Sequence, residues 1–340
     1  MNKQGFIAIS FHWLFIALIG GFLLFFFFNL VSTGVDVAQN QQSIQLVTNL
    51  ETLFSAFAQN EHTDGPISIG ERTQLTLSCD FIGEGVASNF RANRGIDLSL
   101  NNLVIYSPVE LEGPTIYAKT IPANMPFYVG SVLLLVDTRT KFYFEGFSED
   151  EFAYLVDALP RGALVENWTD SINDRGMNTI VVVSKNGFSG DLPSRRGLTV
   201  RNITLVPGSS IDQEGTIRYG DADSHKYIGE AMLLGALVSD ENTFLCNTFK
   251  LMQTFSRVSQ VMSLRAGEVQ LEQYTSSEAC RTTQSQIGLA ISRVRSEMSP
   301  LTVSKYRDNY ATIMGELQNE FPSIRALNRE LVERSCPVVY

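Results

Sequence analysis

The chain has 340 residues, of which 44% are hydrophobic and 18% are charged. This balance is typical of a folded protein and excludes an intrinsically disordered chain. The net charge is −10, and residues 1–240 hold 26 acidic and 15 basic side chains, against 10 and 11 in residues 241–340. The acidic outer body argues against nucleic acid as a partner, because phosphate binding requires a basic face.

Residues 6–31 form an apolar run that contains no acidic or basic side chain. A bilayer core about 30 Å thick needs roughly 20 such residues in a helix. Lys3 precedes the run and the next basic residue is Arg72. The positive-inside bias therefore predicts a cytoplasmic segment at residues 1–5, a single transmembrane anchor and about 300 residues outside the cell membrane. A cleavable signal peptide is the alternative, although its apolar core is usually about 7–15 residues long.

Residues 32–61 are predicted to form an amphipathic helical stalk. Apolar side chains recur there every three or four residues, at Ile44, Val47, Leu50, Phe54 and Phe57. Two interpretations stay open. The stripe packs on the chain's own outer domain, or it meets identical helices or other surface proteins in an assembly.

The first residues carry a resemblance to a known family. Lys3, Gln4 and Gly5 are followed by Phe6 and the apolar run, a pattern that resembles the N-terminus of type IV pilin-like proteins. The resemblance implies cleavage between Gly5 and Phe6 by a prepilin peptidase, and a filament core built from the released helix. Ser10 stands where bacterial pilins usually carry Glu. The whole pattern, through the last predicted helix and a short apolar tail, is similar to uncharacterised single-pass surface proteins of archaea, which implies no activity.

Residues 62–223 are predicted to form a sheet-containing extracytoplasmic domain. A Gly/Pro/Asp-rich linker at 62–70 precedes it, and four prolines at positions 108, 114, 122 and 126 indicate a loop-rich stretch. Strands are expected at 75–79, 96–100, 104–106, 132–136, 142–144, 163–165, 179–184, 198–206 and 215–219. Ser148 and Glu151 predict a capping box at the start of a helix that ends near Pro160. These elements predict an α+β or α/β fold with few helices.

Residues 224–340 are predicted to form a helical C-terminal domain. Helices are expected at 227–238, 243–273, 287–298, 303–317 and 324–332, with Pro300 and Pro322 at their boundaries. We expect a helical bundle that packs on the sheet domain or follows it.

The four cysteines, Cys79, Cys246, Cys280 and Cys336, are an even number on the side of the membrane where disulfides persist. Four cysteines allow three pairings. We favour Cys246 with Cys280, which joins two successive helices, and Cys79 with Cys336. Buried free thiols are the alternative. The absence of any CxxC pair argues against a zinc site.

One group of residues has the chemistry of a metal site. Asp221, Asp223 and His225 alternate, so in an extended strand all three would point to one face and could hold a divalent metal. The alternative is that Asp223 or Ser224 caps a helix that begins near Lys226.

Other motifs are few. Asn167 and Asn202 begin N-glycosylation sequons, whereas no GxSxG, P-loop or GxGxxG motif occurs, and no cofactor is predicted. A carboxylate pair of the glycosidase type is not excluded by sequence. The sequence therefore favours an extracytoplasmic structural or interaction protein, such as a pilin-like or cell-surface assembly component. The alternatives are an anchored extracellular hydrolase and a solute-binding ectodomain.

Overall fold

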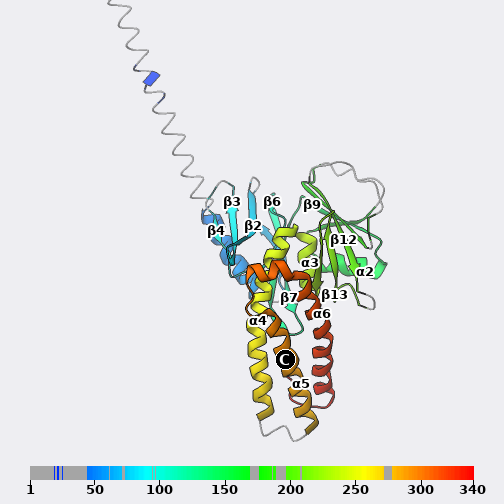
Figure 1. Ribbon diagram of the computed structural model, residues 1–340. Coiled ribbons are helices and arrows are strands. Elements are labelled where there is room, and N and C mark those ends of the chain that lie inside the picture. Colours follow the sequence, from blue (N-terminus) through cyan, green and yellow to red (C-terminus); the bar gives the residue numbers. More distant parts are fainter. Residues whose placement is uncertain are drawn as a thin grey trace, which may run out of the picture.

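The computed structural model describes residues 19, 21, 22, 25, 44–60, 62–70, 73–93, 95, 97–168, 176–185, 187–188, 197–206, 209–271 and 278–340. Within these residues the strands form three sheets. The sheets lie at one end of the molecule, and three long helices run side by side away from them (Figure 1). The fold is thus mixed α/β, as the sequence predicts.

The first sheet is a wall between two hydrophobic cores. Its order is β1-β7-β8-β5, with strands at Asp64–Ser68, Thr115–Asn124, Tyr128–Asp137 and Ile105–Tyr106. Side chains of β8 alternate between the faces: Leu133 and Leu135 join a smaller core, whereas Val132, Leu134 and Val136 join a larger one. Because both faces are covered, the strand is a continuous apolar run.

The smaller core is covered by the helix at residues 44–58. Val47, Leu50 and Phe54 are each at most 1% exposed and pack against the second sheet, where Phe54 contacts Phe90 edge to face. That sheet has the order β4-β3-β2-β6, with strands at Leu98–Ser99, Gly85–Ala92, Gln74–Ile82 and Glu110–Glu112. From Val47 to Phe54 the apolar stripe therefore packs on the chain's own sheets, as the first of the two interpretations predicts. Ile44, at the start of the stripe, is 37% exposed, and residues 32–43 of the predicted stalk lie outside the described residues.

The third sheet has the order β10-β9-β11-β12-β13-β14. Its strands are β9 (Thr140–Glu145), β10 (Leu164–Asn167), β11 (Thr179–Lys185), β12 (Leu198–Leu205), β13 (Glu214–Tyr219) and β14 (Ser224–Ile228). Helix α2 (Glu149–Ala158) connects β9 to the parallel strand β10. The predicted capping box is confirmed: Glu151 N–H donates to Ser148 Oγ, and the Glu151 carboxylate accepts from Ser148 N–H.

The remaining helices are α3 (Glu230–Val238), α4 (Glu241–Leu271), α5 (Glu278–Met298) and α6 (Val303–Glu333). Helix α3 is apolar all round and buried, and a Cβ atom at Gly235 would lie 2.6 Å from the ring of Tyr106, so the close approach requires glycine. The larger core runs from Tyr106 to Val339 and joins the first and third sheets to all of these helices. This core contains residues from both predicted domains, 62–223 and 224–340, so the two parts share one core.

Two segments predicted as linker or loop contain strands. Strand β1 lies within the supposed linker, and it tolerates Pro66 because it is an edge strand that pairs with β7 alone. Strand β7 contains Pro122. Thr120 N–H donates to Thr63 O on the β1 side, so the nitrogen of Pro122 faces the same side, beyond Asp64, the first residue of β1. Neither proline leaves a ladder hydrogen bond unmade.

Two helix boundaries also differ from the prediction. Residues 224–228 form the edge strand β14, so the helix expected from residue 227 begins at Glu230. Pro322 lies inside α6, where the buried neighbours Phe321 and Ile324 hold the helix against the core; non-helical dihedral angles occur instead at Asn309. Tertiary packing here outweighs the helix-breaking tendency of proline.

Candidate functional site: a polar cavity beside a buried lysine

The cysteines form two disulfides, but not the pairs that we favoured. Cys79 on β2 bonds to Cys246 on α4, and Cys280 at the start of α5 bonds to Cys336 after α6. The predicted pairing was wrong because β2 packs against the first turns of α4, which places Cys79 beside Cys246. Helices α5 and α6 pack side by side and are antiparallel, so the start of one meets the end of the other.

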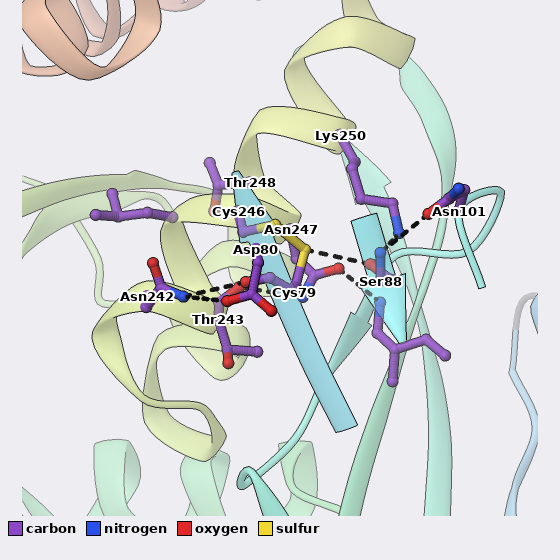
Figure 2. Close-up of a disulfide and its surroundings, with 12 residues drawn as sticks. Cys79, Asp80, Ser88, Asn101, Asn242, Thr243, Cys246, Asn247, Thr248 and Lys250 are labelled. Atoms are coloured by element: carbon purple, nitrogen blue, oxygen red, sulfur yellow. Dashed lines mark hydrogen bonds between the residues drawn. A yellow bond between two sulfur atoms is a disulfide. The ribbon is translucent and has the colours of Figure 1, made fainter. Parts of the chain in front are cut away.

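The side chain of Lys250, including its charged amine, is buried next to the first disulfide. Only 5% of its surface is exposed. Its Nζ donates to Ser88 Oγ at 2.9 Å, to Leu100 O at 3.2 Å and to Leu103 O, as Figure 2 shows in part. The three ammonium hydrogens are thus satisfied by neutral acceptors of strand β3 and of the segment that follows β4.

Among the described residues, no ion pair compensates the charge of Lys250. Burial lowers the pKa of this amine from 10.5 to about 8, since desolvation disfavours the charged form. Among the charged groups on neighbouring elements, Asp80 on β2 accepts from Asn242 Nδ2 at 3.3 Å, and Arg91 on β3 pairs with Asp97. At neutral pH a mostly protonated ammonium is therefore held inside the protein, and the described residues supply no counter-ion to it.

A polar cavity of about 370 Å³ opens beside this lysine. One wall is a stripe of α4 at helical spacing, formed by Lys250, Gln253, Thr254 and Arg257. The opposite wall contains Gly85, Val86, Asn101, Asn102 and Val104. Asn101 Oδ1 accepts from Ser88 N–H at 2.9 Å, which leaves its Nδ2 group as a donor. The lining contains two cations, four other polar side chains and no carboxylate.

Ser88 and Lys250 have the composition of a Ser–Lys catalytic pair, and their separation is within hydrogen-bond reach. However, Ser88 is 8% exposed, its hydroxyl donates to Cys79 Sγ at 3.2 Å, and the cavity against it measures about 10 Å³. That volume holds about one water molecule. No acyl substrate reaches the hydroxyl, so the pair links α4 to β3.

The predicted metal ligands are not brought together. His225 lies on β14, is 9% exposed, and its Nε2 lies 2.6 Å from Glu241 Oε1. Asp221 and Asp223 are exposed and precede the strand in a turn. In the described parts of the chain no group of three His, Cys, Asp or Glu residues could hold a metal ion. The prediction failed because the strand begins after both carboxylates, so the expected alternation does not apply to them.

The two sequons differ in their surroundings. Asn167 ends the edge strand β10 and is exposed. Asn202 lies on β12, is half-buried, and its Oδ1 accepts from Phe188 N–H at 3.1 Å. The geometry favours Asn167 as an acceptor over Asn202.

The predicted processing site, Gly5 and Phe6, and most of the predicted anchor at 6–31 lie outside the described residues. Ile19, Phe22 and Phe25, which are described, are 43%, 66% and 68% exposed. Across the residues with a described position, no helix is both long enough and apolar enough to span a membrane.

Sequence reasoning did not identify the cavity. Its signal was present, because Lys250, Gln253, Thr254 and Arg257 follow a helical spacing within a helix otherwise notable for its apolar face. The opposite wall, more than 140 residues earlier in the chain, had no such signal. Searches of protein-family models, curated proteins and solved structures found no match to the chain.

Proposed function

We propose that this chain is a membrane-anchored, extracytoplasmic structural or interaction protein. The observation that carries the proposal is the pair of disulfides, which span 167 and 56 residues and use all four cysteines. Stable disulfides are typical of oxidising compartments. Together with the apolar residues 6–31 and the single basic side chain before them, they support a cytoplasmic N-terminus and a body outside the cell membrane.

The shape of the outer body supports an interaction role. Helices α4, α5 and α6 extend beyond the sheets (Figure 1). Val261 and Leu264 on α4 and Leu289 on α5 are 60%, 64% and 58% exposed. Ser263 Oγ and Ser292 Oγ lie 2.9 Å apart on these helices, which places Leu264 and Leu289 at a similar height. Exposed apolar side chains on a projecting pair of helices suit contact with another protein.

Pilin-like assembly is the more specific form of the proposal. The stripe of Val47, Leu50 and Phe54 is buried in the smaller core of the same chain. Contacts between copies would therefore depend on the apolar residues 6–31. The filament model of the family then requires a free N-terminus at Phe6.

Intact mass and N-terminal sequencing of protein from its native membrane test this proposal. Recovery in the membrane fraction after carbonate washing, with two disulfides, is the expected result. A chain that begins at Phe6 supports prepilin-type processing, and one that begins at Met1 supports a plain signal anchor. Recovery of the protein in the cytosol with four free thiols overturns the proposal.

A further inference from the structure

We propose that the cavity between α4 and the segment after β4 binds a small oxyanion, the carboxylate or phosphate group of a solute. This site goes beyond the proposed interaction role and stands independently of it. The proposal rests on the cavity's position, its donors and its charge.

The first argument is the buried charge of Lys250, which lines the cavity. An ammonium that is 95% removed from solvent costs free energy unless it is paired. Three neutral acceptors satisfy its hydrogen bonds, but they leave the net positive charge in place. An anion in the cavity would supply the missing counter-charge without replacing any of these bonds.

The second argument is the chemistry of the lining. Arg257 lies seven residues, or about two turns, beyond Lys250 on the same face of α4. Arg257 is exposed, and none of the described residues forms an ion pair or a side-chain hydrogen bond with it. Gln253 and Asn102 add amide donors that no other described residue engages. A planar guanidinium is suited to hold a carboxylate or phosphate through two hydrogen bonds.

The third argument is the contrast with the rest of the molecule. Acidic residues exceed basic ones by 10 in the whole chain, yet none of the described residues that line this cavity carries a carboxylate. A second cavity, of about 310 Å³, also contains two arginines, Arg325 and Arg329, but includes Glu214 among its lining residues. The second cavity therefore provides a matched control.

Binding and protonation are linked at this site. An anion that prefers the ammonium form raises the pKa of Lys250, and its affinity falls when the amine loses its proton. The charged groups on the elements around Lys250 include Arg257 on α4, Asp80 on β2, Glu84 in the turn between β2 and β3, and the Arg91–Asp97 pair, in which Arg91 belongs to β3. A lysine with only a structural role would show no such response to anions.

The test is calorimetric titration of the intact, disulfide-bonded protein with inorganic phosphate and, separately, glucuronate, at constant ionic strength in chloride. At pH 7 we expect saturable binding of at least one probe, at least tenfold weaker in Arg257→Gln and unchanged in Arg325→Gln. Tighter binding of phosphate indicates a phosphate group as the ligand, and tighter binding of glucuronate indicates a carboxylate group, as in a sugar acid. At pH 9.5 the affinity should fall at least tenfold.

A second readout follows Lys250 directly. In protein labelled at the lysine Cε, the titration midpoint of Lys250 should move to higher pH when the bound probe is present, in the wild-type protein but not in Arg257→Gln. Absence of saturable binding by both probes overturns the proposal. So does equal affinity in Arg257→Gln, or a loss of binding in Arg325→Gln.

Discussion

The buried ammonium of Lys250 predicts an unusual dependence of stability on pH. Its pKa falls from 10.5 in the unfolded chain to about 8 in the folded protein. Between these values the unfolded state binds more protons, so the free energy of unfolding rises with pH. The cost of keeping the charge buried is fully present below about pH 8. It is relieved as the pH approaches 10.5.

The shift of roughly 2.5 pH units corresponds to about 3 kcal/mol. Lys250 is not fully deprotonated in the unfolded state at pH 10, so only part of this difference appears in the experiment. We expect the free energy of unfolding to rise by about 2 to 3 kcal/mol between pH 7 and pH 10. Buried tyrosines act in the opposite direction near and above pH 10. Burial raises the pKa of Tyr106, Tyr154 and Tyr227, so the unfolded state loses their protons first.

The variant Lys250→Met separates these contributions. It keeps a long side chain, removes the titrating group and leaves every tyrosine in place, so the difference between the two proteins isolates Lys250. Urea unfolding at pH 7, 8, 9 and 10, with the disulfides intact, measures the difference. We expect the wild-type protein to gain stability relative to the variant as the pH rises. A constant difference across this range would refute the reasoning that the ammonium is buried without a counter-ion.

Three further predictions concern the rest of the fold. Replacing both Cys79 and Cys246 by Ser should lower the free energy of unfolding by up to about 5 kcal/mol, because the bond closes a loop of 167 residues; an unchanged urea midpoint would contradict the pairing. Phe54→Ala should lower the free energy of unfolding by about 3 to 5 kcal/mol in the same assay, since the ring is fully buried. A loss below 1 kcal/mol would mean that the stripe does not pack in the smaller core. If the protein is made in a cell that glycosylates, Asn167→Gln should remove the glycan mass and Asn202→Gln should not.

The sequence by itself determined the features that depend on local spacing. The capping box at Ser148 and Glu151 was readable because both partners lie within one helical turn. The buried strand β8 was readable from five consecutive apolar residues, and the stripe at 47–54 from its helical period. The long helices α4 and α6 are recognisable for the same reason, although Pro322 predicts a helix end that the structure does not have.

Tertiary structure alone decided the features that join distant segments. The disulfide partners are set by which helix lies beside β2 and which helix end meets α5, and neither is encoded in cysteine spacing. His225 is bound by Glu241 and not by the carboxylates near it in the chain, because β14 begins after them. The cavity at Lys250 requires α4 to pack against a segment about 150 residues earlier. Local periodicity shows which face of a helix is polar, but only packing against a second segment turns that face into one wall of a cavity.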